Sequence, residues 1–159
     1  DQAIGHLRRC RYEQLVRTPG DMLVLCHGDG GPTNFIINAK GIYLIDFETL
    51  RIDLRAYDLY RVLYNSCKDH QWNFAIAEHL LNGYRNAASL TRDDIELLKV
   101  WLRFPRTTHL LLRQTVKNKR GRRVANVQAF RRALAAERKI AGFIDQLDRY
   151  AERHLTNGS

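Results

Sequence analysis

The stretch LCHGDGGPTNFIINAKGIYLIDFE, residues 25–48, decides how the rest of the chain is interpreted. Three apolar runs in and beside it, residues 22–26, 35–37 and 42–45, have the length and composition of strands. Residues 38–41 form a tight connection between the last two runs, in which Gly41 can adopt a positive φ and close a hairpin. Because polar residues follow the strand ends, we expect chemistry on a small, rigid β unit.

The polar residues at these strand ends fit the requirements of phosphoryl transfer. This reaction needs a carboxylate that orients and deprotonates the accepting hydroxyl, and oxygen ligands that hold Mg²⁺ against the phosphates. Asp29 suits the first task, and Asn34, across a Gly-Gly-Pro loop, offers an amide oxygen to a cation. Asp46, after the second hairpin strand, offers an anionic ligand. Asp29 and Asn34 are also common turn residues, but the neighbouring Asp46 favours the catalytic interpretation.

The pattern His-x-Asp-x-x-x-x-Asn, an apolar hairpin and then Ile-Asp-Phe resembles the aminoglycoside phosphotransferase and choline kinase family, relatives of the protein kinases. The resemblance implies that Asp29 is the catalytic base and that His27 supports its loop. It further implies that Asn34 and Asp46 bind Mg²⁺ and, through it, the nucleotide. Glu48 stands where protein kinases have glycine, in a segment similar to the choline kinase version, and is expected to assist the metal or the substrate.

Asp58 is the further residue that the resemblance singles out. Family members have an Asp-Leu pair here at the start of a helix, and the carboxylate accepts hydrogen bonds from the catalytic loop. A helix N-terminal acid stabilised by the helix dipole is an equally open explanation, and the two are compatible. The spacing from Asp53 to Asp58 is more similar to that of spore-coat kinase-like proteins of the CotS type than to that of many antibiotic kinases. A non-catalytic spore-coat component therefore stays open beside the enzyme.

The rest of the chain is expected to be helical. Residues from about 2 to 17 predict a short helix, and from residue 57 onward apolar positions recur at three- and four-residue steps. Residues 91–94 predict a capped helix start, Pro105 ends or kinks that helix, and a last helix is expected from about 127 to 155. The predicted fold is α+β and mainly helical. By the resemblance it corresponds to a protein-kinase-like C-terminal lobe with a small β-hairpin carrying the catalytic loop.

In this group, a strand-rich lobe binds ATP. No counterpart of that lobe is expected before Asp29, since only 28 residues precede Asp29 and their pattern predicts mainly helix. We therefore expect residues 1–159 to be a single domain and a fragment of a longer protein, inactive without the missing N-terminal lobe of that protein. In full-length form, the resemblance implies ATP- and Mg²⁺-dependent phosphorylation of a hydroxyl on a small-molecule or sugar-like acceptor.

Composition excludes several other classes of protein. No apolar run approaches the length of a membrane span and no secretory signal is visible, so a cytoplasmic protein is expected, or one in the spore coat. Cys10, Cys26 and Cys67 lie far apart, which predicts buried or idle thiols and neither a zinc site nor a disulfide framework. Trp72 and Trp101 sit at helical spacing and are expected in the core or in groove walls.

The formal net charge of +9 is concentrated in residues 113–139, which hold ten Lys or Arg against one acid. The basic run at residues 117–123 has the charge to contact nucleic acid or another anionic surface. It lacks interleaved aromatic residues and a recognisable binding fold, so a solvated loop is favoured and nucleic acid is not expected as a partner. Binding of an acidic substrate is a third possibility.

Overall fold

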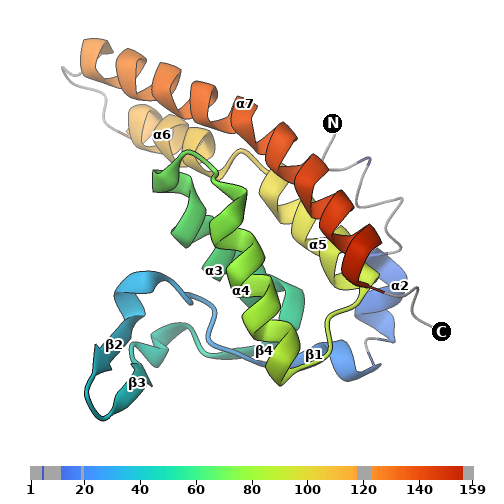
Figure 1. The fold of residues 1–159 in the computed structure, drawn as a ribbon. Coiled ribbons are helices and arrows are strands. Elements are labelled where there is room, and N and C mark those ends of the chain that lie inside the picture. Colours follow the sequence, from blue (N-terminus) through green and yellow to red (C-terminus); the bar gives the residue numbers. More distant parts are fainter. Residues whose placement is uncertain (1–4, 6–11, 19, 118–122, 156–159) are drawn as a thin grey trace.

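The structure, a computed structural model, describes residues 5, 12–18, 20–117 and 123–155. Figure 1 shows a group of packed helices with two small β-ribbons along one edge. The elements in chain order are α2 (Tyr12–Arg17), β1 (Leu23–Cys26), β2 (Phe35–Asn38), β3 (Gly41–Leu44), β4 (Arg51–Leu54), α3 (Arg55–Cys67), α4 (Phe74–Ala87), α5 (Arg92–Arg103), α6 (Arg106–Lys117) and α7 (Arg123–His154). The prediction of a mainly helical α+β fold is confirmed.

Two antiparallel ribbons make up the β-structure of the described residues. The predicted hairpin is present, with β2 paired to β3 from Phe35↔Leu44 to Asn38↔Gly41, and Gly41 has the positive φ, 147°, that closes it. The second ribbon was not predicted, because its strand β4 has only four residues and two of them are charged. It pairs with β1 and ends directly before α3, so the two ribbons bracket the loop that follows β1.

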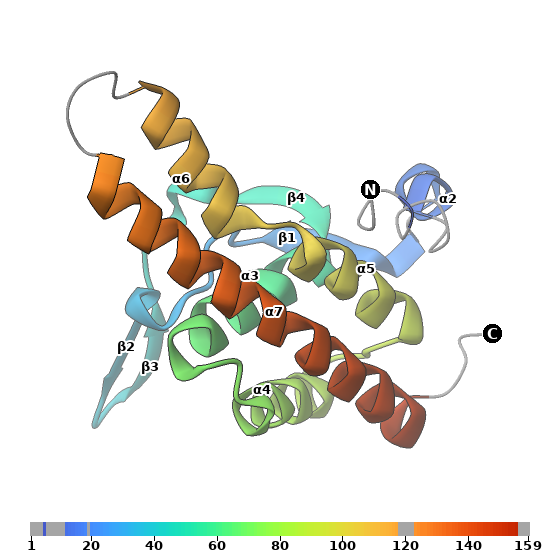
Figure 2. The ribbon, with the colours of Figure 1, turned by 90° about the horizontal axis from the view of Figure 1, so that it is seen from above.

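Helix α3 lies at the centre of the helical part, between α4, α5 and α7 (Figure 2). The main core combines fully buried side chains of α3, α4, α5 and α7. They include Leu63, Cys67, Leu81, Leu98, Leu102, Phe143 and Leu147. Trp72 is buried in this core and Trp101 packs against it, as their spacing predicted. A mainly apolar stripe on each helix therefore sets the fold, and it leaves the N-terminal end of α3 facing the ribbons.

The ends of the helices follow the sequence signals. At the start of α5, the Thr91 side chain accepts a hydrogen bond from Asp94 N, and the Asp94 carboxylate accepts one from Thr91 N, which completes the expected capping box. Pro105 separates α5 from α6, and α7 begins at Arg123, before the expected residue 127.

Asp94 also joins α5 to α3. Its carboxylate, which is fully buried, accepts hydrogen bonds from Arg55 Nε and Nη2 at 2.9–3.1 Å. Arg55 is the first residue of α3 and is buried as well, and it also reaches Asp21 at 3.4 Å. This paired and hydrogen-bonded arrangement is what a buried charge requires.

Several expectations fall on residues that are not described. Of the expected helix at residues 2–17, the structure describes α2 (Tyr12–Arg17) and residue 5. Cys10 and residues 118–122 of the basic run lie outside the described part of the chain. Within the described residues, no helix combines the length and the apolar character needed to cross a bilayer.

Candidate active site

The loop that follows β1 is fixed to the start of α3 by Asp58. One carboxylate oxygen, Oδ2, accepts the backbone N–H of His27, and the other, Oδ1, accepts that of Gly28, both at 2.7 Å. Hydrogen bonds to an ionised acceptor are shorter and stronger than those between neutral groups. The expected hydrogen bonds from the loop to Asp58 are therefore present, and the catalytic importance of this support stays a prediction.

The His27 ring ties the same loop to the segment that carries Asp46. Its Nδ1 accepts the backbone N–H of Asp29 at 3.3 Å, so the ring proton is assigned to Nε2, which donates to the Ile45 carbonyl at 2.9 Å. The ring is buried and packs 5.1 Å from Phe47, measured between ring centroids. This position suits a supporting residue better than one that contacts substrate.

Gly28 requires glycine, and the rest of this loop also lies directly against other segments. Gly28 has φ +82°, and a Cβ there would lie 2.5 Å from the carbonyl oxygen of Thr49, in the short helical turn η3 (Phe47–Thr49). A Cβ at Gly30 or Gly31 would lie 2.8 Å from side chains of α3. The Thr49 hydroxyl also donates to the His27 carbonyl at 2.7 Å. The loop is thus packed between η3 and α3.

Asp29 forms an ion pair with Arg61, which projects from α3. Its Oδ1 accepts a hydrogen bond from Arg61 Nη2 and a longer one, 3.4 Å, from Asn65 Nδ2. The hydrogen bond from Arg61 is the largest cause that holds the pKa of Asp29 below its usual value. Both contacts use Oδ1, and the side chain is 42% exposed, so Oδ2 remains available to a further partner.

Arg61 was missed by the sequence analysis, and its environment is unusual. The residue is 7% exposed, and its Nε and Nη1 have no hydrogen-bond partner among the described residues. A cation one turn after Asp58 on α3 was the only sequence signal, and it does not separate a site residue from one on a solvated helix face.

Asn34 and Asp46 lie at the same end of the hairpin. Asn34 immediately precedes β2, and its carbonyl accepts a hydrogen bond from Ile45 N at 3.0 Å, directly before Asp46. The Asn34 Nδ2 donates to the Asp29 carbonyl at 2.8 Å, which identifies Oδ1 as the oxygen that points away from the loop backbone. Asp46 is exposed and has a left-handed backbone, φ 67° and ψ 65°. Such strain in a non-glycine residue costs about 1–2 kcal/mol and clusters at functional sites.

Glu48 lies in η3 and is exposed, so it reaches the same solvent region from the next turn of the chain. No described residue forms a hydrogen bond or ion pair with the carboxylate of Asp46 or Glu48. The described residues hold no group of three or more His, Cys, Asp or Glu that could bind a metal ion. An Asn–Asp pair needs no such group, because Mg²⁺ keeps several waters and takes few protein ligands.

The chain is similar to known proteins in sequence and in fold. The sequence profile of the phosphotransferase enzyme family matches residues 1–101 of the chain. A crystal structure of an aminoglycoside phosphotransferase from Alicyclobacillus acidocaldarius subsp. acidocaldarius DSM 446 superposes with a TM-score of 0.71 at 19% identity. The match covers 94% of this chain and 48% of the other, so the chain spans about half the length of that protein. No curated protein matches the chain in sequence.

Proposed function

Because the chain belongs to the phosphotransferase enzyme family, we propose that it is the catalytic C-terminal lobe of a kinase that transfers phosphate from ATP to a hydroxyl of a small-molecule or sugar-like acceptor. One observation carries the proposal. Asp29 is an accessible, ionised carboxylate on a loop whose backbone is held on one side by Asp58 and on the other by η3. Positioning of the reacting groups is a main contribution of a protein to the catalysis of phosphoryl transfer.

Asp29 would orient the accepting hydroxyl and take its proton. Since Arg61 lowers the pKa of Asp29, the carboxylate is charged at neutral pH and ready to accept a hydrogen bond through Oδ2. A carboxylate with a lowered pKa is a weak base. In the loose transition state of phosphoryl transfer this costs little, because the hydroxyl needs orientation more than early deprotonation.

Asn34 and Asp46 would hold Mg²⁺, with Glu48 close by on η3. When bound, Mg²⁺ and ATP supply the transferable phosphoryl group and neutralise the charge on its oxygens. The residues fit this role in their chemistry, since the Asn34 Oδ1 and the Asp46 carboxylate are both hard oxygen donors. The hydrogen bond from Asn34 Nδ2 to the Asp29 carbonyl would keep the metal ligand and the base in a fixed relation.

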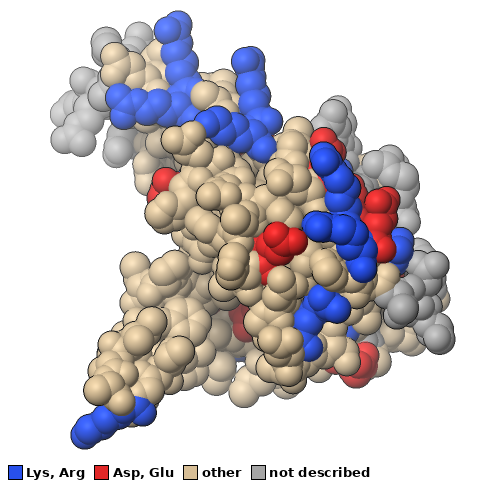
Figure 3. Space-filling view, viewed as in Figure 1, with Lys and Arg blue, Asp and Glu red and all other residues tan. Residues whose placement is uncertain are grey.

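The nucleotide-binding lobe would cover the β-ribbons. Leu25, Ile37, Ile42 and Ile52 on the four strands are each 67–74% exposed. In Figures 1 and 3 the β2–β3 hairpin projects away from the helices, and its surface carries charge mainly at the tip. Exposed apolar side chains gathered in this way are typical of an interaction surface. Their position beside Asn34 and Asp46 supports a partner lobe that meets the site from this side.

The proposal predicts that Asp29→Asn in the full-length protein lowers the rate of Mg²⁺-dependent ADP release, measured with a panel of hydroxyl acceptors, by about a hundredfold or more. The matched control is Asp145→Asn, an exposed carboxylate on α7 that should leave the rate unchanged. Equal rates for wild type and Asp29→Asn would contradict the catalytic role. If the full-length protein also shows no Mg²⁺-dependent nucleotide binding, a non-catalytic scaffold such as a CotS-type spore-coat component becomes the better interpretation.

A further inference from the structure

One side of α7 is exposed near the start of the helix. Between residues 127 and 139, eight side chains are exposed and the others are half-buried or buried. At about 100° per residue, the eight positions fall within an arc of about 160° around the helix. The buried Ala133 and Ile140 lie on the opposite side, toward the core. We call the eight residues the outer face of α7: Val127, Gln128, Arg131, Arg132, Leu134, Ala135, Arg138 and Lys139.

The outer face of α7 is positively charged. Four of its eight residues are Arg or Lys, and none is an acid. Among the described residues, none of these four cations forms a salt bridge with a carboxylate. Lys139 Nζ donates a hydrogen bond to the neutral side chain of Gln71 at 3.1 Å. The outer face therefore presents cations to solvent without acids beside them.

The acids of α7 do not neutralise this charge. Glu137, the one acid between residues 127 and 139, is half-buried. Its Oε1 accepts hydrogen bonds from the backbone N–H and the hydroxyl of Thr108 on α6. The next exposed acid of α7 is Asp145, about 10 Å further along the helix than Arg138. The positive surface is thus confined to the first half of α7.

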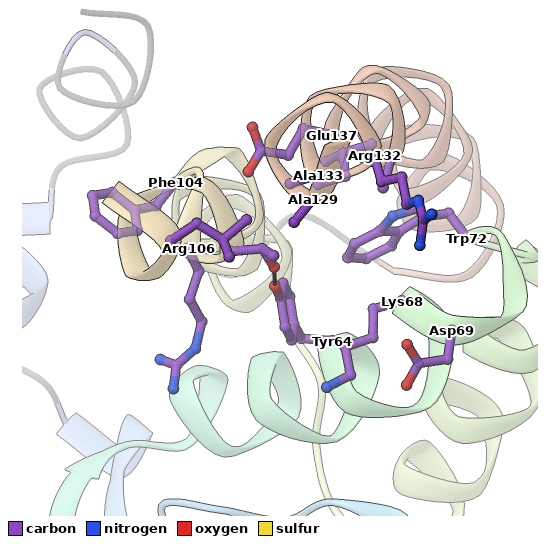
Figure 4. A pocket seen from close by; sticks show the side chains of 14 residues that line it. Tyr64, Lys68, Asp69, Trp72, Phe104, Arg106, Ala129, Arg132, Ala133 and Glu137 are labelled. Carbon is purple, nitrogen blue, oxygen red and sulfur yellow. Dashed lines mark hydrogen bonds between the residues drawn. The ribbon is translucent and has the colours of Figure 1, made fainter. Parts of the chain in front are cut away.

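The inner side of α6 and α7 has a more balanced charge. It borders a cavity of about 420 Å³ between α3, α6 and α7 (Figure 4). The charged residues that line this cavity include two acids beside three cations, namely Asp69, Glu137, Lys68, Arg106 and Arg132. The excess of positive charge in this part of the molecule therefore lies outside the cavity.

This end of the molecule is separate from the β-ribbons. In Figures 1 and 2, α6 and the start of α7 project beyond α3 and α4, away from the β2–β3 hairpin. Figure 3 shows Lys and Arg side chains gathered over the same end. A nucleotide-binding lobe that covers the ribbons would leave the outer face of α7 accessible to another partner.

Apolar side chains among the cations indicate the kind of partner. Val127 and Leu134 are 52% and 40% exposed. Positions 127, 131, 134 and 138 fall within an arc of about 60°, so these two side chains lie on the same side as Arg131 and Arg138. Cations alone would suit any polyanion, including nucleic acid. An anionic bilayer can in addition bury apolar side chains at the level of its headgroups, so the mixture favours lipid.

We propose that the outer face of α7 binds the surface of a bilayer that contains anionic lipids, without crossing it. The inference goes beyond the proposed function and does not depend on it. The Arg and Lys side chains would contact lipid phosphates, while Val127 and Leu134 would enter the headgroup region. Because the outer face lies on a helix of 32 residues at the edge of the molecule, it can meet a flat surface without any change in the core.

The test is co-sedimentation of the full-length protein with sucrose-loaded vesicles, either of phosphatidylcholine alone or of phosphatidylcholine mixed with phosphatidylglycerol. We expect binding to the mixed vesicles only. Binding should weaken as KCl is raised, because salt screens the attraction between exposed charges. Absence of binding to the mixed vesicles at low salt would overturn the proposal.

Arg131→Gln/Arg138→Gln should weaken vesicle binding by about twentyfold, since each cation near an anionic bilayer contributes about fivefold. The matched control is Lys40→Gln/Arg85→Gln, which removes the same charge from exposed positions on the β2–β3 connection and on α4 and should bind nearly as wild type does. All four positions are exposed, and thermal unfolding followed by circular dichroism checks that each variant keeps the fold. Equal weakening by the two double variants would contradict a role for the outer face.

Leu134→Gln separates a lipid surface from nucleic acid, because it removes apolar area and leaves the charge unchanged. It should weaken binding to the mixed vesicles severalfold and leave the affinity for a short RNA duplex, measured by fluorescence anisotropy, as in wild type. The proposal is overturned if Leu134→Gln binds the vesicles as wild type does, or if wild type binds the duplex more tightly than the vesicles.

Discussion

At the scale of single residues, the position of Arg61 has the largest consequence. Its guanidinium is buried. Its Nη2 donates a hydrogen bond to Asp29, but its Nε and Nη1 have no partner among the described residues. A buried cation with unused donors is costly, so its retention beside a carboxylate on a fixed loop points to a task at the site. We interpret Arg61 as a positioning residue that sets both the orientation and the charge of Asp29.

Arg61→Gln should raise the pKa of Asp29, because it removes the hydrogen bond and the charge that lower it. The proposed base Asp29 works only when it is deprotonated, so the acidic limb of the pH profile of kcat/KM should move to higher pH, and the rate at low pH should fall most. The measurement is kcat/KM against pH for wild type and variant. Arg85→Gln, an exposed arginine of α4, should leave the profile in place, and Arg61→Lys should restore part of it. An unmoved acidic limb in Arg61→Gln would contradict the assignment.

The residues of the candidate site differ in whether local sequence patterns or contacts between distant positions mark them. His27, Asp29, Asn34 and Asp46 could be proposed from the sequence because each lies near a strand end, and strand ends are recognised from local patterns. Arg61 was not found, since its partner lies 32 residues away. Contacts of that length depend on how α3 packs, which periodicity alone does not report.

At the scale of elements, the N-terminal ends of α3 and α5 are fastened together by one carboxylate. Asp94 is both the third helical residue of the α5 capping box, whose N-cap is Thr91, and the counter-ion of Arg55. The capping box was predictable from the spacing of Thr91 and Asp94, whereas the ion pair joins residues 39 apart and was not. The short β4 was missed in the same way, as its pairing with β1 is non-local.

Asp94→Ala should therefore destabilise the protein by about 3–5 kcal/mol, because it leaves a buried guanidinium with only the weak contact to Asp21. Thr91→Ala, which removes only the cap, should cost about 1 kcal/mol. Urea denaturation of both variants measures the difference in the free energy of unfolding. The double variant Arg55→Met/Asp94→Ala should be more stable than Asp94→Ala alone. A cost for Asp94→Ala no larger than that for Thr91→Ala would show that the ion pair does not matter.

At the scale of the whole molecule, most buried apolar residues lie among the helices, whereas the β-ribbons carry a group of exposed apolar side chains. The core follows from the helical periodicity and was predictable in outline. The exposure of the β-ribbons was not predictable, because short apolar strands show the same sequence pattern whether they are buried or exposed to solvent. The proposed lobe arrangement can be checked by testing whether the β-ribbons are covered in the full-length protein.

In the full-length protein, a cysteine placed at Ile42 should react slowly with iodoacetamide, although Ile42 is 69% exposed in this chain. The control is Leu112→Cys on α6, where Leu112 is 50% exposed and should react fast. Burial raises the pKa of Cys26 and Cys67 to about 11, so near pH 8 these native thiols contribute little background. Cys10 and any cysteine outside this chain are changed to serine. Faster labelling at residue 42 than at residue 112 would mean that no lobe covers the ribbons.

The close contact between Gly28 and Thr49 limits which substitutions the loop can accept. Any side chain at position 28 would have to displace a backbone carbonyl, and no substitution elsewhere in η3 can shorten the backbone to make room. Displacing Thr49 would also break its hydrogen bond to His27. The loop with Asp29 and the turn after Asp46 are thus coupled through Gly28 and Thr49, so a change in one that alters this contact requires an adjustment in the other.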